Sequence, residues 1–161
     1  MKKVVFDIEP DTNIMDSIKR TGGTTAQNIM ELIDNSIDAM YDYETGEKLI
    51  KKQDIIIKFD VIKKGEHKGK LGWLITDKAS GILDPKNVWK LGASKKKKNL
   101  GKFGVGLKVA SLSLGDVVWI ETSTKSSNKK TIIKYHQKIF KEKKEWKTPG
   151  LIGKEDRKKH Y

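Results

Sequence analysis

The chain has 161 residues, with 34 basic and 21 acidic side chains and a formal net charge of +13. This length suits one domain built around a single hydrophobic core. Because the chain has no cysteine, its sequence excludes a disulfide framework, a thiolate zinc site and a cysteine nucleophile. Its apolar runs are far shorter than the roughly 20 residues of a membrane-spanning helix, and its N-terminal segment does not resemble a secretory signal. We therefore expect a cytoplasmic protein with no membrane partner.

The basic excess is almost entirely lysine, since Arg20 and Arg157 are the two arginines of the sequence. Lysine is a mobile point charge, whereas arginine presents the planar fork that suits specific phosphate and base contacts. Two interpretations stay open. The lysines form a solvated surface, or they attract nucleic acid or another polyanion without sequence specificity.

The first half of the chain alternates helix and strand signals. In chain order these signals predict a strand, a short helix, a long helix and two strands, over residues 4–8, 12–19, 24–43, 54–62 and 71–76. Pro10 ends the first strand, and Gly22 and Gly23 end the short helix. Thr24 or Thr25 then caps the long helix.

The residue pattern in the second half of the chain predicts a short helix, a lysine-rich loop, an apolar helix and a hairpin, over residues 85–90, 92–101, 103–114 and 117–135. We assign residues 1–137 to one domain and 138–161 to a charged tail or a truncated continuation of that domain. The tail has two open alternatives, a partial helix to Trp146 or disorder. The expected fold class is α+β, a two-layer sandwich in which helices cover one face of a mixed sheet.

Three polar residues share one face of the long helix. Glu31, Asn35 and Asp38 fall within about 60° of each other, nearly opposite the apolar stripe that includes Leu32 and Ile37. On periodicity alone this is a solvent-exposed face. A carboxylate one turn before an amide oxygen also suits a general base beside a magnesium ligand, because Mg²⁺ takes oxygen ligands and often needs few protein groups besides phosphates.

Two glycine-containing stretches could bring backbone close to a ligand. Asp77 directly follows a predicted strand and precedes Gly81, which places a fixed acceptor beside an approachable backbone. The three glycines at positions 101, 104 and 106 enter an apolar helix, where N–H groups and the helix dipole favour phosphate. Neither the dinucleotide fingerprint nor the P-loop pattern fits this stretch.

Taken in order, the motifs are Glu31-x-x-x-Asn35-x-x-Asp38-Ala39, Asp77-x-x-x-Gly81 and Gly101-x-x-Gly104-x-Gly106. This series resembles the GHKL family of ATPases, which includes gyrase-type topoisomerases, ninety-kilodalton heat-shock chaperones, histidine kinases, MutL and MORC proteins. The resemblance spans about residues 24–114, and the motifs look nearest to the chaperone, MutL and MORC versions. It implies a Bergerat-type fold that binds ATP or ADP with Mg²⁺.

The resemblance also implies a role for each motif residue. Asn35 would ligate Mg²⁺, Glu31 would orient or deprotonate the attacking water, and Asp38 would support the inner face of the site. Asp77 would accept a hydrogen bond from the adenine amino group, and Gly81 would let the base lie against the backbone.

A phosphate-binding segment and a lid follow from the same resemblance. The segment that would wrap the phosphates comprises Gly101, Gly104, Val105, Gly106, Leu107 and Lys108. Residues 93–100 would form an ATP lid that closes over the γ-phosphate. Within this lid, Lys95 and the lysines after it either screen phosphate charge or form a solvated loop.

Two features depart from the family pattern. Ala79 replaces the first glycine of the usual Asp-x-Gly-x-Gly motif. The later strand with a Gly-Thr pair behind the adenine aspartate has Thr148-Pro149-Gly150 as its nearest counterpart. Many relatives also take a γ-phosphate lysine from a second domain, so we expect slow hydrolysis from this chain.

The expected function is Mg²⁺-dependent ATP binding with slow hydrolysis and a lid that switches on nucleotide binding. The alternative is a nucleotide-gated binding module without turnover, whose basic surface engages DNA or a protein. The resemblance further predicts an ATP-dependent homodimer or a larger parent protein.

Overall fold

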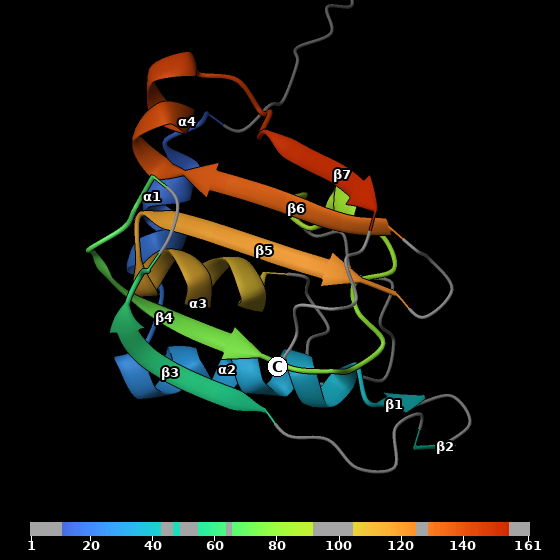
Figure 1. The fold of residues 1–161 in the computed structure, drawn as a ribbon. Helices are drawn as coiled ribbons and strands as arrows, with labels where there is room; N and C mark the ends of the chain where they lie inside the picture. The colour runs from blue at the N-terminus through green and yellow to red at the C-terminus, as the bar shows by residue number, and fades with distance from the viewer. Residues whose placement is uncertain are drawn as a thin grey trace, which may run out of the picture.

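The computed structural model describes residues 11–42, 47–48, 55–63, 66–91, 105–124 and 129–154 of the chain. Its helices are α1 (Ile14–Arg20), α2 (Thr25–Asp38), α3 (Gly106–Leu114), α4 (Gln137–Lys143) and the 3-10 turn η1 (Pro85–Asn87). Its strands are β1 (Tyr41–Asp42), β2 (Glu47–Lys48), β3 (Ile56–Val61), β4 (Leu71–Thr76), β5 (Val117–Ser123), β6 (Lys129–His136) and β7 (Gly150–Lys154). Helices α1, α2 and α3 lie on one side of the longer strands (Figure 1), as the α+β class predicts.

The long helix begins where the sequence predicts and ends earlier. Thr24 and Gln27 form a reciprocal capping box, which satisfies N–H groups at the start of α2. The predicted end near Tyr43 is wrong, because α2 ends at Asp38. A tight turn closes the helix through a 2.9 Å bond from Met40 N–H to the Ile37 carbonyl, and Tyr41 then pairs with β2.

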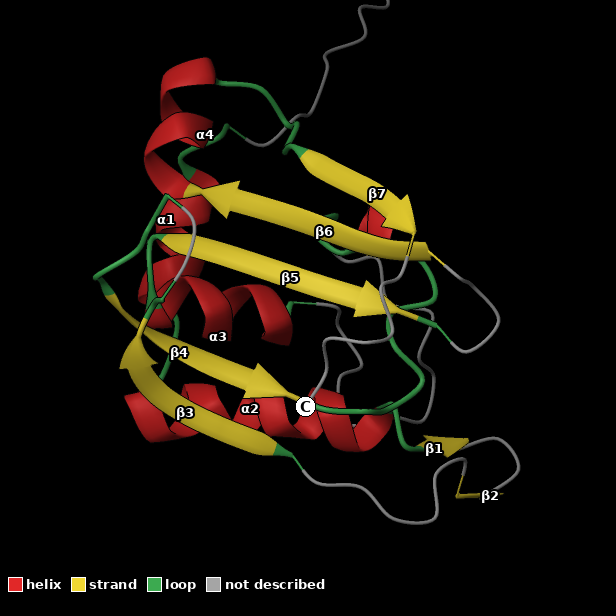
Figure 2. Cartoon of the chain, in the orientation of Figure 1, coloured by secondary structure: helices red, strands yellow, loops and turns green. Residues whose placement is uncertain are grey.

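The strands form an antiparallel hairpin and a three-stranded antiparallel sheet (Figure 2). In the hairpin, β3 pairs with β4 so that Phe59 lies opposite Trp73, with ring centroids 4.6 Å apart. In the sheet, β6 pairs with β5 on one edge and with β7 on the other. Among the described strands every pairing is antiparallel, so the parallel component expected of a mixed sheet does not occur in them.

Residues 138–154 pack on and pair with the rest of the described fold. Of the two alternatives for the tail, the structure contains the helix, which ends at Lys143 rather than at Trp146. Strand β7 follows and pairs with β6 in the register Thr131 opposite Ile152. Because the sequence there lacks a clear alternation of apolar and polar residues, pairing with β6 decides that it is a strand.

The best-packed core lies where α1, α3, β6 and α4 meet. Met15, Leu112, Tyr135 and Phe140 are each at least nine-tenths buried and form one cluster. Trp89 stacks on Tyr135 with ring centroids 4.6 Å apart. Burial raises the pKa of the Tyr135 phenol well above its usual value. By comparison the β3–β4 hairpin is open to solvent, and Phe59 is 55% exposed.

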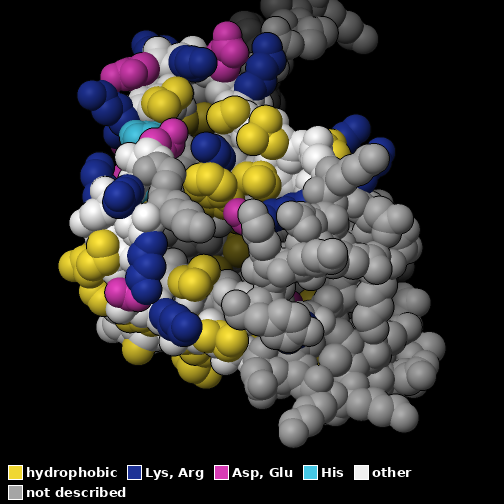
Figure 3. Space-filling view, viewed as in Figure 1, with side chains coloured by type: hydrophobic (Ala, Val, Ile, Leu, Met, Phe, Trp, Pro, Cys, Tyr) yellow, Lys and Arg dark blue, Asp and Glu magenta, His cyan; other side chains and the backbone are white. Residues whose placement is uncertain are grey.

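Basic side chains are scattered over the described part of the face shown in Figure 3, interspersed with acidic and apolar ones. In the part of the chain that the structure describes, the helices are too short or too polar to cross a bilayer.

Candidate functional site

The polar face of α2 is turned toward the protein, not toward solvent. Asp38 is 4% exposed, and Glu31 and Asn35 are partly buried. Helix α3 packs along α2 and covers part of this face. The interpretation of a solvent-exposed face is therefore wrong, because periodicity locates the apolar side of a helix but does not show what covers its polar side.

Glu31 from the first motif lies directly against Gly106 at the start of α3. A Cβ built on Gly106 would lie 1.8 Å from Glu31 Oε1 and 2.7 Å from Cδ, well inside van der Waals contact. The absence of a side chain at position 106 is what lets the carboxylate approach the α3 backbone so closely. The structure thus brings the first and third motifs together at the helix N-terminus.

Asn35 has its amide oriented by its own helix. Its Nδ2 donates a 2.7 Å hydrogen bond to the Glu31 carbonyl, so the nitrogen is engaged and Oδ1 is the atom left to meet a ligand. Among the described residues there is no group of three or more His, Asp or Glu side chains that could cage a metal. A single amide oxygen completed by water and nucleotide phosphates is nevertheless a set of ligands that Mg²⁺ accepts. Asn35 therefore fits the role of a magnesium ligand.

Asp77, directly after β4, has a hydrogen bond on each carboxylate oxygen. Oδ2 accepts from the Ser36 hydroxyl at 2.7 Å, and Oδ1 accepts from the Ala79 N–H at 2.9 Å. The Ser36 contact joins α2 to the end of β4 across 41 positions of sequence. Because a carboxylate has about four acceptor sites, Asp77 retains acceptor capacity for a ligand that donates a hydrogen bond.

The loop after Asp77 is tied to elements on both sides. Ser80 N–H donates to the Ala39 carbonyl at the end of α2, at 3.3 Å. Ile82 N–H donates to the Thr122 hydroxyl on β5, at 2.8 Å. These bonds hold the loop of the second motif between helix α2, which carries the first motif, and the three-stranded sheet.

Gly81 occupies a position that no other residue type would fill without strain. Its φ is +75°, and a Cβ there would lie 2.0 Å from the Ser123 backbone carbonyl. Ala79, in contrast, does not adopt a positive φ. The departure from the family motif at position 79 therefore costs no backbone strain, and the conformation that needs glycine lies at position 81.

The structure describes the third motif from Val105 onward. Val105 precedes α3, and Gly106 and Leu107 are its first residues. The Lys108 N–H already donates to the Val105 carbonyl at 3.0 Å, so it belongs to the first helical turn. The Lys108 side chain is 3% exposed, and this burial lowers the pKa of its ammonium group.

Part of the predicted site lies outside the described residues. This part comprises Lys95, Gly101, Gly104 and the proposed lid over residues 93–100. The described site is therefore made of α2, the loop after β4, the end of β5 and the start of α3.

Two hydroxyl residues that the sequence interpretation did not single out take part in this arrangement. Ser36 binds Asp77, and Thr122 binds the loop after it. Thr148, which lies in a segment without the Gly-Thr pair of the family, donates its hydroxyl to the Lys134 carbonyl on β6. The sequence gives little sign of either role, because a serine within a helix does not by itself indicate a functional residue and a threonine such as Thr122 is common in strands.

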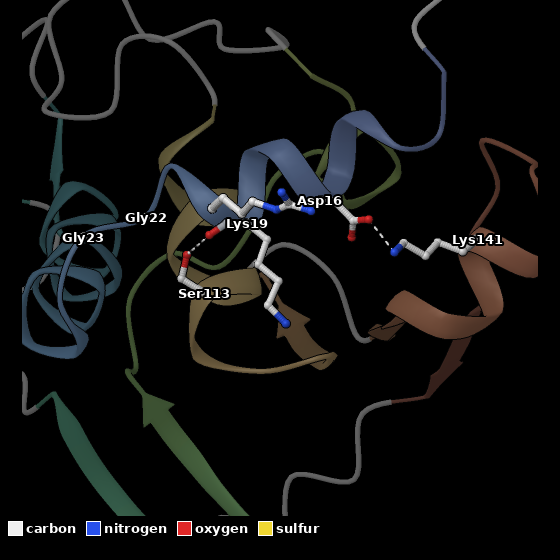
Figure 4. Close-up of a pocket in the computed structure, with 7 residues that line it drawn as sticks. Asp16, Lys19, Gly22, Gly23, Ser113 and Lys141 are labelled. Atoms are coloured by element: carbon white, nitrogen blue, oxygen red, sulfur yellow. Dashed lines mark hydrogen bonds and ion pairs between the residues drawn. The ribbon is translucent and has the colours of Figure 1, made fainter.

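A separate hollow of about 490 Å³ lies beside the C-terminal end of α1. Figure 4 shows the residues that line it, which are Asp16, Lys19, Arg20, Gly22, Gly23, Ser113 and Lys141. Lys141 and Lys19 form ion pairs with Asp16 and Asp116. The hydrogen bond from Lys141, more than any other contact, holds the pKa of Asp16 below its usual value, against the opposing effect of burial. The hollow contains none of the predicted site residues.

The described elements form an α+β domain in which residues of the three motifs lie close together. Residues 24–159 match the model of the family described as histidine kinase-, DNA gyrase B-, and HSP90-like ATPase. Because this match covers most of the chain, the chain belongs to that family, and its ATPase domain is of the GHKL type. No curated protein is similar enough to the chain to count as a match.

Proposed function

We propose that this chain binds ATP with Mg²⁺ and hydrolyses it slowly, with Glu31 acting on the attacking water. The observation that carries the proposal is the close approach of the Glu31 carboxylate to Gly106. It places a potential base at the N-terminus of α3, where backbone N–H groups and the helix dipole favour phosphate. Membership of an ATPase family supports the same assignment.

Helix α2 would hold both ends of the nucleotide. Glu31 and Ser36 are five residues apart, so their positions differ by about 7.5 Å along the helix axis. Glu31 meets the start of α3, while Ser36 meets Asp77 at the end of β4. We assign the phosphates to the first of these places and the base to the second.

At the base end, Asp77 would accept a hydrogen bond from the adenine amino group through an acceptor site that Ser36 and Ala79 leave unused. The positive φ of Gly81 brings the loop backbone close to β5 without an intervening side chain. Because the space of the missing Gly81 side chain is taken by the Ser123 carbonyl of β5, adenine would lie against the backbone on the other side of this loop. Asp38, which is 4% exposed, would support the inner wall of the site.

At the phosphate end, Asn35 Oδ1 would hold the metal, since its amide nitrogen is engaged by the Glu31 carbonyl. Bound Mg²⁺ supplies charge neutralisation at the β- and γ-phosphates. Glu31 would orient a water for in-line attack and accept its proton, while the N–H groups of Gly106 and Leu107 would stabilise phosphate oxygens. The N–H of Lys108, the last residue of this segment, is already used inside the helix by the Val105 carbonyl, so we do not assign it a phosphate contact.

The proposal extends to the rest of the third motif and to the lid. Gly101 and Gly104 would complete the phosphate-binding segment, and residues 93–100, including Lys95, would close over the γ-phosphate. Nucleotide-dependent pairing of two copies, or a second domain that supplies a phosphate lysine, would accelerate hydrolysis.

Calorimetric titration with Mg-ATP and Mg-ADP tests binding directly, and a steady-state assay of Glu31→Ala tests the chemistry. We expect this variant to bind ATP with wild-type affinity and to lose turnover about 100-fold or more. Glu142→Ala, which removes an exposed carboxylate on α4, is the matched control and should hydrolyse at the wild-type rate. Wild-type turnover in Glu31→Ala would refute the assignment of the base.

A second candidate is a nucleotide-gated module that engages DNA without turnover. The observation in its favour is the hollow beside α1, where Arg20 lies beside the ion-paired Lys19 and Lys141. Polyanion binding would weaken steeply with salt. DNA retention that depends on ATP, in a protein with no measurable hydrolysis, would favour this candidate over the first.

A further inference from the structure

We propose that Ser36 is a positioning residue that sets the preference of this site for adenine by holding the Asp77 carboxylate. The inference rests on the proposed function and concerns a residue that does not itself touch the reacting atoms. Ser36 is 5% exposed, and its hydroxyl donates to Asp77 Oδ2 at 2.7 Å. It therefore forms a buried polar link between α2 and the end of β4.

The single hydroxyl proton of Ser36 has two acceptors within reach. The Leu32 carbonyl of the preceding turn is 3.5 Å away, at the outer limit of a hydrogen bond, whereas Asp77 Oδ2 is 2.7 Å away. A serine inside a helix commonly bonds back to its own backbone. Here the shorter contact, to a carboxylate, takes the proton, so the hydroxyl serves a tertiary contact.

Together two donors fix the plane of the Asp77 carboxylate. Ser36 binds one oxygen, and the Ala79 N–H binds the other at 2.9 Å. Rotation about the last bond of an aspartate side chain is otherwise broad and nearly two-fold. With both oxygens held, the remaining acceptor sites have a defined direction, which the loop bonds of Ser80 and Ile82 preserve.

A fixed acceptor discriminates between purines. The adenine 6-amino group donates a hydrogen bond, whereas hypoxanthine and guanine present a carbonyl oxygen at the same position. A carboxylate held in place meets that carbonyl with two acceptors facing each other and cannot turn away at low cost. Removal of the Ser36 hydroxyl frees one oxygen, so binding of ATP weakens while the penalty against a 6-oxo purine relaxes.

The test compares the dissociation constants of Mg-ATP and Mg-ITP for wild type, Ser36→Ala and Ser36→Cys by calorimetry. We expect wild type to prefer ATP, and Ser36→Ala to lose about 5- to 20-fold in ATP affinity with ITP affinity within about twofold of wild type. Ser36→Cys keeps a weak donor of similar size and should give an intermediate ATP to ITP ratio. Ser113→Ala is the matched control, because it removes a hydroxyl that binds the Lys19 carbonyl at 2.8 Å, and it should leave the ratio unchanged.

Each outcome separates this inference from the proposed function. If wild type binds neither nucleotide, the proposed function is wrong; if it binds both equally, the assignment of the base to Asp77 is wrong. If wild type prefers ATP and Ser36→Ala weakens both nucleotides equally or neither, Ser36 is only a packing residue and the inference is overturned. Thermal unfolding monitors the fold, and Ser36→Cys decides by the same ratio if Ser36→Ala does not fold.

Discussion

The two ends of the site are held by different physical means. At the base end, Asp77 accepts directional hydrogen bonds from Ser36 and Ala79. At the phosphate end, Glu31 reaches the α3 backbone because Gly106 leaves space for it. Where hydrogen bonds fix the acceptor, removing a donor should lower the affinity and selectivity for the nucleotide. Where a missing side chain leaves room for a carboxylate, adding a methyl group should displace that carboxylate.

The largest expected effect comes from a substitution that disturbs the phosphate end of the site alone. In Gly106→Ala the new methyl would lie 1.8 Å from Glu31 Oε1, so the carboxylate must move. Because this is the far end of a flexible side chain, the fold should adapt. A displacement of about 1 Å costs about 100-fold in turnover, so we expect kcat to fall by that factor with the Kd of Mg-ATP within about threefold. Steady-state kinetics measure kcat, and calorimetry measures the Kd of Mg-ATP. An unchanged kcat would show that the close approach of Glu31 to Gly106 does not matter for turnover.

The next effect tests the backbone at the base end. Gly81→Ala places a methyl 2.0 Å from the Ser123 carbonyl oxygen at a φ of +75°. We expect the free energy of unfolding to fall by at least about 2 kcal/mol and the Kd of ATP to rise about tenfold.

Gly69→Ala is the control for this variant. Gly69 also has a positive φ of +89°, but among the described residues, its two chain neighbours aside, no atom lies within 4 Å of its added Cβ. It should lose about 1 kcal/mol through backbone strain alone, with no change in ATP affinity. Urea unfolding distinguishes the two glycines; equal losses would show that the contact with Ser123 is unimportant.

A further effect at the base end is expected when the Asp77 acceptor is altered without changing its shape. Asp77→Asn replaces one acceptor oxygen with an NH₂ group, from which the Ser36 hydroxyl oxygen can accept but which would meet the adenine amino group with two donors facing each other. A mismatched buried hydrogen bond costs about 1–3 kcal/mol, which raises the Kd of ATP about 5- to 150-fold. At saturating ATP, kcat should stay within about threefold of wild type. A normal Kd in the calorimeter would show that the base lies elsewhere.

The smallest effect lies outside both ends of the site. The pKa of Asp16 is lowered chiefly by its hydrogen bond from Lys141 and also by Gln137. Its contribution to stability is complete above its unfolded pKa, near 3.8, and is lost as the pH falls through the lower folded value. Asp16→Asn should therefore reduce stability at neutral pH and flatten its decline in acid, in urea unfolding between about pH 2 and pH 7. ATP binding at neutral pH should not change.

Much of the fold follows from local pattern. The capping box at Thr24, the apolar runs of β3 and β4 and the Pro85 turn lie close to their expected places. The errors concern elements that depend on pairing with another segment of the chain. Tyr41 leaves the helix to pair with β2, and β7 forms because β6 offers an edge.

By itself the sequence determined that a carboxylate and an amide share one helix face, because Glu31 and Asn35 are one helical turn apart. It also placed Asp77 at the end of a strand. Only the tertiary structure decided that the polar face of α2 turns inward, since helical periodicity does not report what packs against a polar side. The same holds for the Ser36–Asp77 bond, which joins residues 41 positions apart and depends on where β4 ends beside α2.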